Sequence, residues 1–121
     1  MLSYILALVI LAAVLVGLSL GPDATYISMK YFDSVLHLLT GVGLGFFFDA
    51  LTVSIGSRRW HTRSAIVLIA FGAGIVWEIF EIYFNITGFS LWTTMYYLDT
   101  TKDLLLDIVG AWVAVHIITY K

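Results

Sequence analysis

Four apolar stretches, each close to the length that a helix needs to cross a lipid bilayer, run through this chain of 121 residues. A membrane-spanning helix takes about 20 mostly apolar residues. The stretches cover about residues 3–20, 31–55, 64–86 and 100–120, and the first contains no ionisable side chain. This pattern predicts an all-α fold, an integral membrane bundle of four transmembrane helices that forms a single domain over residues 1–121.

The composition supports lipid as the surrounding solvent. Hydrophobic residues make up 61% of the chain and charged residues 12%, against about half and about a quarter in soluble domains. A chain this small could bury only about two-thirds of its surface in a soluble fold. The net charge of -2 gives no basis for nucleic-acid binding. The absence of cysteine excludes disulfides and thiolate-bound zinc.

The distribution of basic residues predicts how the chain is oriented. The connection between the second and third stretches holds three arginines, Arg58, Arg59 and Arg63, and Lys121 ends the chain. The opposite side keeps only Lys30 and Lys102. Cytoplasmic loops carry the excess of Lys and Arg, so we expect both termini and the arginine loop in the cytoplasm. We also expect the first stretch to be retained, because no clear cleavage site follows it.

Ionisable side chains within the predicted spans are the main candidates for function. An Asp at the middle of a spanning helix costs roughly 2.5–3.5 kcal/mol on insertion scales. The candidates are spaced three or four residues apart, so each pair shares a helical face. In the predicted topology all of them reach one level near the outer membrane face. They are Asp33, His37, Glu78, Glu81, Asp103 and Asp107, with Asp99 just outside its span.

Carboxylates and one imidazole from three helices are ligands that suit a divalent metal ion such as Mn, Zn, Fe or Mg. We predict five metal ligands, with Glu81 as general base or as a neighbour of the ligands: Asp33, His37, Glu78, Asp103 and Asp107. Four further residues would support or gate the site, and three of these belong to a covering loop at residues 89–98: Asp99, Trp92, Tyr96 and Tyr97.

Three functions remain open for such a cluster. A bound metal would activate water against a lipid headgroup or another membrane-embedded ester. A proton- or cation-coupled transporter or channel would use the same acids as a relay. A non-catalytic scaffold subunit would need them only as a hydrogen-bonded network. Of the other acids, Asp49 is expected to pair with Arg58 or Arg59, or to reach the solvated membrane surface.

Membrane lipids are the expected partners, with anionic headgroups at the arginine loop. Small residues let membrane helices approach closely, and they are frequent on three of the stretches. We expect them to serve helix packing, and a homo-oligomer through the Gly-rich faces is an open alternative. The residues concerned are Gly41, Gly43, Gly45, Gly72, Gly74, Gly110, Ala111 and Ala114.

Three motifs within residues 31–114 carry a resemblance to a known family. They are Tyr31-x-Asp33-x-x-x-His37-x-x-x-Gly41, Trp77-Glu78-x-x-Glu81, and Asp99-Thr100-x-x-Asp103 leading to Gly110-Ala111. Together they resemble the YjdF-like family of predicted bacterial and archaeal inner-membrane proteins, and more loosely the VanZ-like proteins. The resemblance implies an uncharacterised prokaryotic inner-membrane protein with the shared polar cluster, and it implies no reaction. The chain departs from the family in having fewer N-terminal helices, and Thr101 stands where members often carry Gln.

Overall fold

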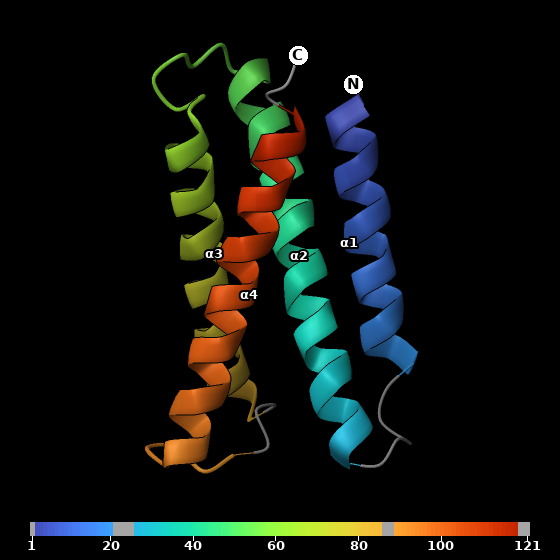
Figure 1. Cartoon of the computed structure of the whole chain (residues 1–121), viewed down its shortest axis with the longest axis vertical. Helices are drawn as coiled ribbons and strands as arrows, with labels where there is room; N and C mark the ends of the chain where they lie inside the picture. Colours follow the sequence, from blue (N-terminus) through green and yellow to red (C-terminus); the bar gives the residue numbers. More distant parts are fainter. Residues whose placement is uncertain (1, 21–25, 86–88, 119–121) are drawn as a thin grey trace.

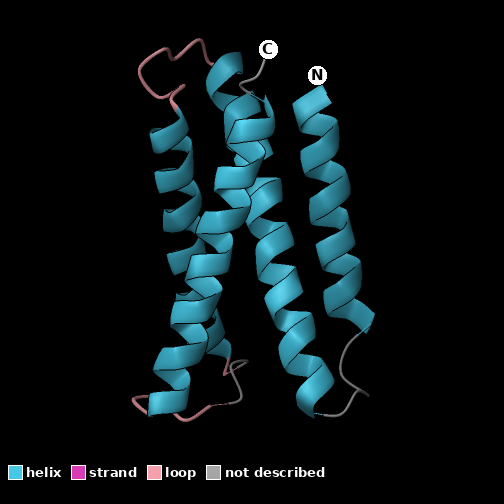
Figure 2. Ribbon diagram, in the orientation of Figure 1, coloured by secondary structure: helices cyan, strands magenta, loops and turns pink. Residues whose placement is uncertain are grey.

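The computed structural model describes residues 2–20, 26–85 and 89–118, and these residues form an all-α bundle (Figures 1 and 2). Within them lie four helices, α1 (Leu2–Leu20), α2 (Tyr26–Ser54), α3 (Arg63–Phe84) and α4 (Thr94–Ile118). The all-α bundle predicted from the sequence is confirmed. The N-terminal end of α1 and the C-terminal end of α4 lie at the same end of the bundle as the connection between α2 and α3 (Figure 1).

Two helices begin earlier than the hydropathy pattern predicts. Helix α2 starts at Tyr26 rather than near residue 31, and α4 starts at Thr94 rather than near residue 100. The loop predicted for residues 89–98 is therefore wrong in its second half. The hydroxyl of Thr93 accepts a hydrogen bond from the Tyr96 backbone N–H at 3.3 Å. Such a cap satisfies a backbone donor that a helix start leaves unpaired, so the helix begins before its apolar stretch does.

Helix α3 has a defined cap at each end. Thr62 adopts an extended conformation and its side chain accepts from the Ala65 backbone N–H at 3.2 Å. At the other end, Asn85 takes a left-handed conformation with φ of 54°, and its N–H reaches the carbonyls of Glu81 and Ile82. Asn tolerates this conformation better than most residues. The caps fix where α3 begins and ends. They thereby set the height of Glu81, which lies in its last turn.

Helices α2 and α4 form the central and most extensive contact, and glycines bring their backbones together. A Cβ atom at Gly41 would collide with the backbone carbonyl of Asp107, and one at Gly110 would collide with the carbonyl of Leu38. A Cβ at Gly45 would lie 2.6 Å from that of Ala114. Gly41, Gly45 and Gly110 are therefore used within the bundle, as small residues are in membrane helix contacts. Association of copies through glycine faces stays a prediction.

The outer helices pack differently on this central pair. Helix α1 packs against α2, while α3 packs mainly against α4, and α1 and α3 stand on opposite sides of the pair in Figure 1. A small core joins α1, α2 and α4 through Ala7, Phe46 and Ala114.

Length and composition allow two of the described helices to cross a membrane. They cover Tyr31–Ser54 and Arg63–Phe84, and a shorter apolar helix covers Ser3–Leu15. Many large apolar side chains on these helices face outward, including Leu8, Val35, Leu68 and Val76, each more than half exposed. Apolar side chains on the outside are what a lipid environment requires of a small bundle.

Candidate metal centre

The imidazole of His37 is the centre of the polar cluster. It lies on α2 and is 5% exposed. Its Nε2 atom is 3.7 Å from Asp33 Oδ1, one turn earlier on the same helix, and 3.9 Å from Asp103 Oδ2 on α4. One ligand atom from each of these three side chains lies within 4.8 Å of the other two. These three residues could therefore hold a metal ion.

The separations resemble those of metal ligands. Ligand atoms around a tetrahedral ion are about 3.3–3.6 Å apart when bonds measure about 2.0–2.2 Å. The distances from Nε2 to the two carboxylates are only slightly longer than this. Small rotations of the carboxylates of Asp33 and Asp103 would bring all three atoms to bonding distance. The donor set of one nitrogen and two oxygens suits a borderline or hard divalent ion.

Asp107 contacts the other nitrogen of the same ring. The Nδ1 atom of His37 lies 3.4 Å from both carboxylate oxygens of Asp107, which is 1% exposed on α4. A carboxylate at Nδ1 favours a proton there, which leaves the Nε2 lone pair directed at Asp33 and Asp103. Metal-binding histidines usually have this carboxylate partner. Asp107 lies outside the group of three possible ligands, so its predicted role as a ligand stays a prediction.

Lys102 also belongs to the cluster. From the sequence it was counted only among the charges of the side opposite the arginine loop. Its Nζ atom lies 2.9 Å from Asp99 Oδ1, 3.0 Å from Asp103 Oδ1 and 3.3 Å from Asp33 Oδ2. Asp33 and Asp103 therefore each direct one oxygen toward Lys102 and the other toward His37. The ammonium thus contacts the carboxylate oxygens that are not the ones nearest His37 Nε2. Asp99 acts through Lys102 and does not contact His37 in the described structure.

The two glutamates of α3 flank this group. Glu78 is 5% exposed, and its Oε2 accepts a hydrogen bond from the Thr100 hydroxyl at 2.8 Å. Its Oε1 is buried without a hydrogen-bond partner among the described residues. Glu81 Oε1 accepts from Trp77 Nε1 at 2.9 Å. Glu78 and Glu81 lie outside the group of three possible ligands, so their predicted roles as ligand and base stay predictions.

The aromatic residues predicted to gate the site lie apart from it. Trp92 is 78% exposed, and it contacts Tyr97 with ring centroids 6.3 Å apart. Tyr96 is buried and packs edge-on against Tyr97. None of these three lines the cavity described next. Their gating role stays a prediction, and the early start of α4 holds Tyr96 and Tyr97 on a helix rather than on a loop.

A cavity of about 380 Å³ reaches the cluster from between α1 and α3. Four of its lining residues belong to the acid–imidazole cluster and its flanks: Asp33, His37, Glu81 and Asp107. The remaining walls are mainly apolar and come from three helices: Leu11, Val14 and Leu15 on α1, Leu36, Thr40 and Leu44 on α2, and Ala73, Gly74 and Trp77 on α3. The candidate metal centre is therefore open on one side.

A family model matches residues 1–121, the whole chain, and its description is "Predicted membrane protein (DUF2238)". The chain belongs to this family. No curated protein and no solved structure matches the chain. Membership and the apolar helices together support a membrane location.

In this member of the DUF2238 family, a second buried carboxylate lies far from the candidate metal centre. Asp49 is 4% exposed near the end of α2. Its Oδ1 is 3.7 Å from His61 Nδ1, and the same nitrogen is 3.1 Å from the Thr52 hydroxyl. Among the described residues its charged partner is thus His61. The predicted pairing with Arg58 or Arg59 is corrected, because the loop after α2 folds the imidazole back over the helix end.

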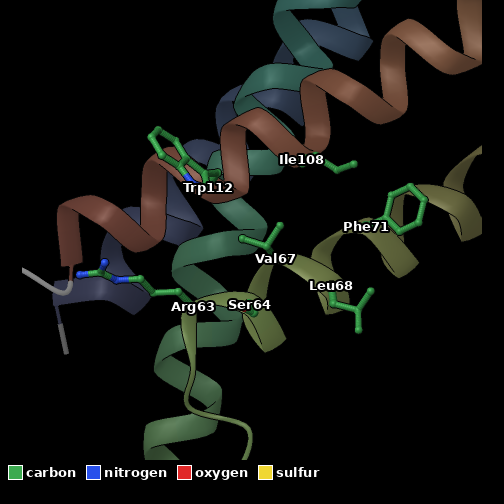
Figure 3. Close-up of a pocket in the computed structure, with 7 residues that line it drawn as sticks. All are labelled: Arg63, Ser64, Val67, Leu68, Phe71, Ile108 and Trp112. Atoms are coloured by element: carbon green, nitrogen blue, oxygen red, sulfur yellow. The ribbon is translucent and has the colours of Figure 1, made fainter.

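This DUF2238 chain has a second groove, of about 350 Å³, at the opposite end of α3 (Figure 3). Arg63 and Ser64 lie at its end, and apolar side chains from α3 and α4 form its sides: Val67, Leu68, Phe71, Ile108 and Trp112. It contains none of the clustered acids. The arginine groove is therefore separate from the cavity at the candidate metal centre, since the two share no lining residue.

Two residues of the site in this DUF2238 protein were not predicted from the sequence. Thr100 was quoted only within a motif, yet its hydroxyl holds Glu78. Lys102 was counted only among the charges of the side opposite the arginine loop, which served to predict the orientation. The spacing carried a usable signal, since Lys102 follows Asp99 by three residues and such neighbours face one another on a helix.

Proposed function

We propose that this protein binds a divalent metal ion through His37 Nε2, Asp33 Oδ1 and Asp103 Oδ2. The observation that carries the proposal is the two-sided environment of the His37 ring. One nitrogen faces the buried carboxylate of Asp107, and the other faces two carboxylates within 4 Å. A histidine held only for packing needs one hydrogen-bond partner for each nitrogen. Two carboxylates converging on the same nitrogen are better explained by a cation between them.

The charges of the cluster favour a bound cation, because carboxylates outnumber basic side chains. Six carboxylates come from the cluster and its flanks: Asp33, Glu78, Glu81, Asp99, Asp103 and Asp107. Lys102 and a protonated His37 would supply only two positive charges. Buried charges in proteins are paired or coordinate metals, because an isolated buried charge is strongly unfavourable. A divalent ion at Nε2 would reduce the excess where the carboxylates are closest.

We further propose that the site hydrolyses a membrane-embedded ester. Catalytic metal sites keep three protein ligands and one open position, and a divalent ion there makes a nucleophile from water at neutral pH. Glu81 lines the cavity and would accept the proton of the attacking water. The water oxygen would bond to the ester phosphorus or carbonyl carbon, and the ester oxygen would leave with a proton. The site would face the outer leaflet, as the distribution of basic residues predicts. The membrane would be a prokaryotic inner membrane, as the YjdF-like resemblance implies.

Manganese binding to the purified protein tests the first part of this proposal. The protein in detergent is titrated with Mn²⁺, and the free ion is followed by its electron paramagnetic resonance signal. We expect one saturable site per chain, from which Zn²⁺ displaces Mn²⁺. If the signal of free Mn²⁺ is the same with and without the protein, and Zn²⁺ does not bind either, the protein has no such site.

A structural ion-pair network is the second candidate function, and Lys102 is the observation that favours it. Of its three carboxylate contacts, the one with Asp33 joins α4 to α2 and could hold the two helices together without any metal. In that case the acids would serve assembly of the bundle, as expected of a scaffold subunit.

Replacing Lys102 by Met separates the two candidates. Both predict that Lys102→Met destabilises the metal-free protein by roughly 1–3 kcal/mol, because buried carboxylates lose a partner. Only the metal site predicts that Mn²⁺ restores stability, by about 2.7 kcal/mol at 100 times its dissociation constant. Lys102→Arg, which keeps the charge, is the matched control. Unfolding by sodium dodecyl sulfate, followed by tryptophan fluorescence, is the measurement, and a variant that Mn²⁺ does not stabilise would favour the network.

A further inference from the structure

The cavity beside the candidate metal centre has a chemically mixed lining. Carboxylates and an imidazole line it together with leucine, valine and alanine side chains. Its volume of about 380 Å³ falls within the range of roughly 300–1,000 Å³ that is common for small-molecule sites. A fully polar ligand would lose hydration along the apolar walls, and a fully apolar one would face the acids. The cavity therefore fits an amphiphile.

The cavity also opens to the outside of the bundle. Leu15 of α1 and Trp77 of α3 line it, and their side chains are 66% and 36% exposed. Helix α1 packs against α2, and α3 packs mainly against α4, so the opening lies between α1 and α3. In a membrane the outside of a bundle is lipid. A molecule already dissolved in the bilayer can enter sideways without passing through water.

We infer that the ligand is a phospholipid, with one acyl chain between α1 and α3 and its phosphate at the metal beside His37. This inference rests on the proposed function, because the acids alone would repel an anionic phosphate. With the ion bound, the phosphate oxygen takes the coordination position that the protein leaves open. The apolar length from Leu11 and Val14 to Ala73 then receives the chain.

Quenching of Trp77 by a brominated lipid reports on this site. The substitutions Trp60→Phe, Trp92→Phe and Trp112→Phe leave Trp77, on the cavity wall, as the single tryptophan. The protein is placed in phosphatidylcholine nanodiscs containing dibrominated phosphatidic acid, and unbrominated phosphatidic acid gives the reference. With Zn²⁺ we expect quenching that saturates at a low mole fraction of the brominated lipid. Without Zn²⁺ the half-quenching mole fraction should rise about tenfold, which equals about 1.4 kcal/mol.

A blocked cavity and a second reporter provide the controls. Ala73→Phe fills the apolar wall, and it should raise the half-quenching mole fraction about tenfold while bound Zn²⁺ stays at one per chain. Val76→Phe adds the same ring at an outward position, where Val76 is 66% exposed, and should change neither. A variant that keeps only Trp112, in the arginine groove, should show quenching that does not depend on Zn²⁺.

The metal content of the same samples, measured by mass spectrometry, distinguishes the metal-site proposal from the phospholipid inference. One outcome is that Zn²⁺ binds, while quenching is linear, does not depend on Zn²⁺ and is unchanged by Ala73→Phe. This outcome would overturn the lipid inference and leave the metal site intact. No bound Zn²⁺ would overturn the metal site and this inference with it. Saturable quenching that is stronger without Zn²⁺ would also overturn it, because the anionic phosphate would then bind without the ion.

Discussion

Replacing His37 by Ala should abolish divalent metal binding, and replacing Asp107 by Asn should weaken it by about 10–100-fold. His37 supplies the only nitrogen among the three proposed ligands, so its loss leaves two carboxylates that Lys102 already holds. Asp107 acts on the opposite ring nitrogen and orients the imidazole. Loss of such an orienting partner costs about 10–100-fold in metal affinity.

The dissociation constant for Mn²⁺ is the measurement for this series, with His116→Ala as the matched control. His116 lies on α4, and its Nδ1 is 2.8 Å from the Trp112 carbonyl, away from the acids. Its replacement should leave the dissociation constant unchanged. Equal metal binding by wild type, His37→Ala and His116→Ala would contradict the assignment of Nε2 as a ligand. Asp107→Asn behaving like His37→Ala would instead make Asp107 a ligand.

Replacing Gly41 by Ala should destabilise the bundle by about 1–3 kcal/mol, the usual cost of overpacking. The added methyl group would meet the Asp107 backbone carbonyl, and backbone on a central helix cannot move aside as a flexible side chain can. The forced shift would also displace the Asp107 side chain that contacts His37. We therefore expect weaker metal binding in the same variant.

Gly72→Ala is the matched control for Gly41→Ala. A Cβ at Gly72 on α3 meets nothing within 4 Å in the described structure. The change should be neutral or should stabilise α3 by about 0.5–1 kcal/mol, because glycine disfavours helix. Unfolding by sodium dodecyl sulfate, followed by circular dichroism, compares the two. Equal stability of both variants would contradict close backbone packing of α2 on α4.

The helical faces of the site were predictable from the sequence, because spacing alone determines them. Asp33 and His37 are one turn apart on α2, and Asp103 and Asp107 are one turn apart on α4, so each pair shares a face. Burial within lipid requires such faces to turn inward. The convergence of these four residues follows from these two facts and agrees with the observed distances.

The assignment of the individual atoms was not predictable from the spacing. Whether Asp103 or Asp107 faces His37 Nε2 depends on the rotation and height of α4 against α2. Those are set by contacts of Gly41, Gly45 and Gly110 across the interface, which a hydropathy pattern does not encode. The start of α4 was missed for a related reason. The Thr93 cap is a local hydrogen bond, and it extends the helix through residues 94–98, which were predicted to belong to a covering loop.

Anomalous X-ray scattering from crystals grown with Mn²⁺ tests the central claim most directly. If the metal site is as proposed, we expect one strong anomalous peak within about 2.0–2.3 Å of His37 Nε2, Asp33 Oδ1 and Asp103 Oδ2. Lys102 should remain on the far oxygens of the two carboxylates. A map without a peak at Nε2, with the Lys102 ammonium between Asp33 and Asp103 and the ring bonded only to carboxylates, would contradict it.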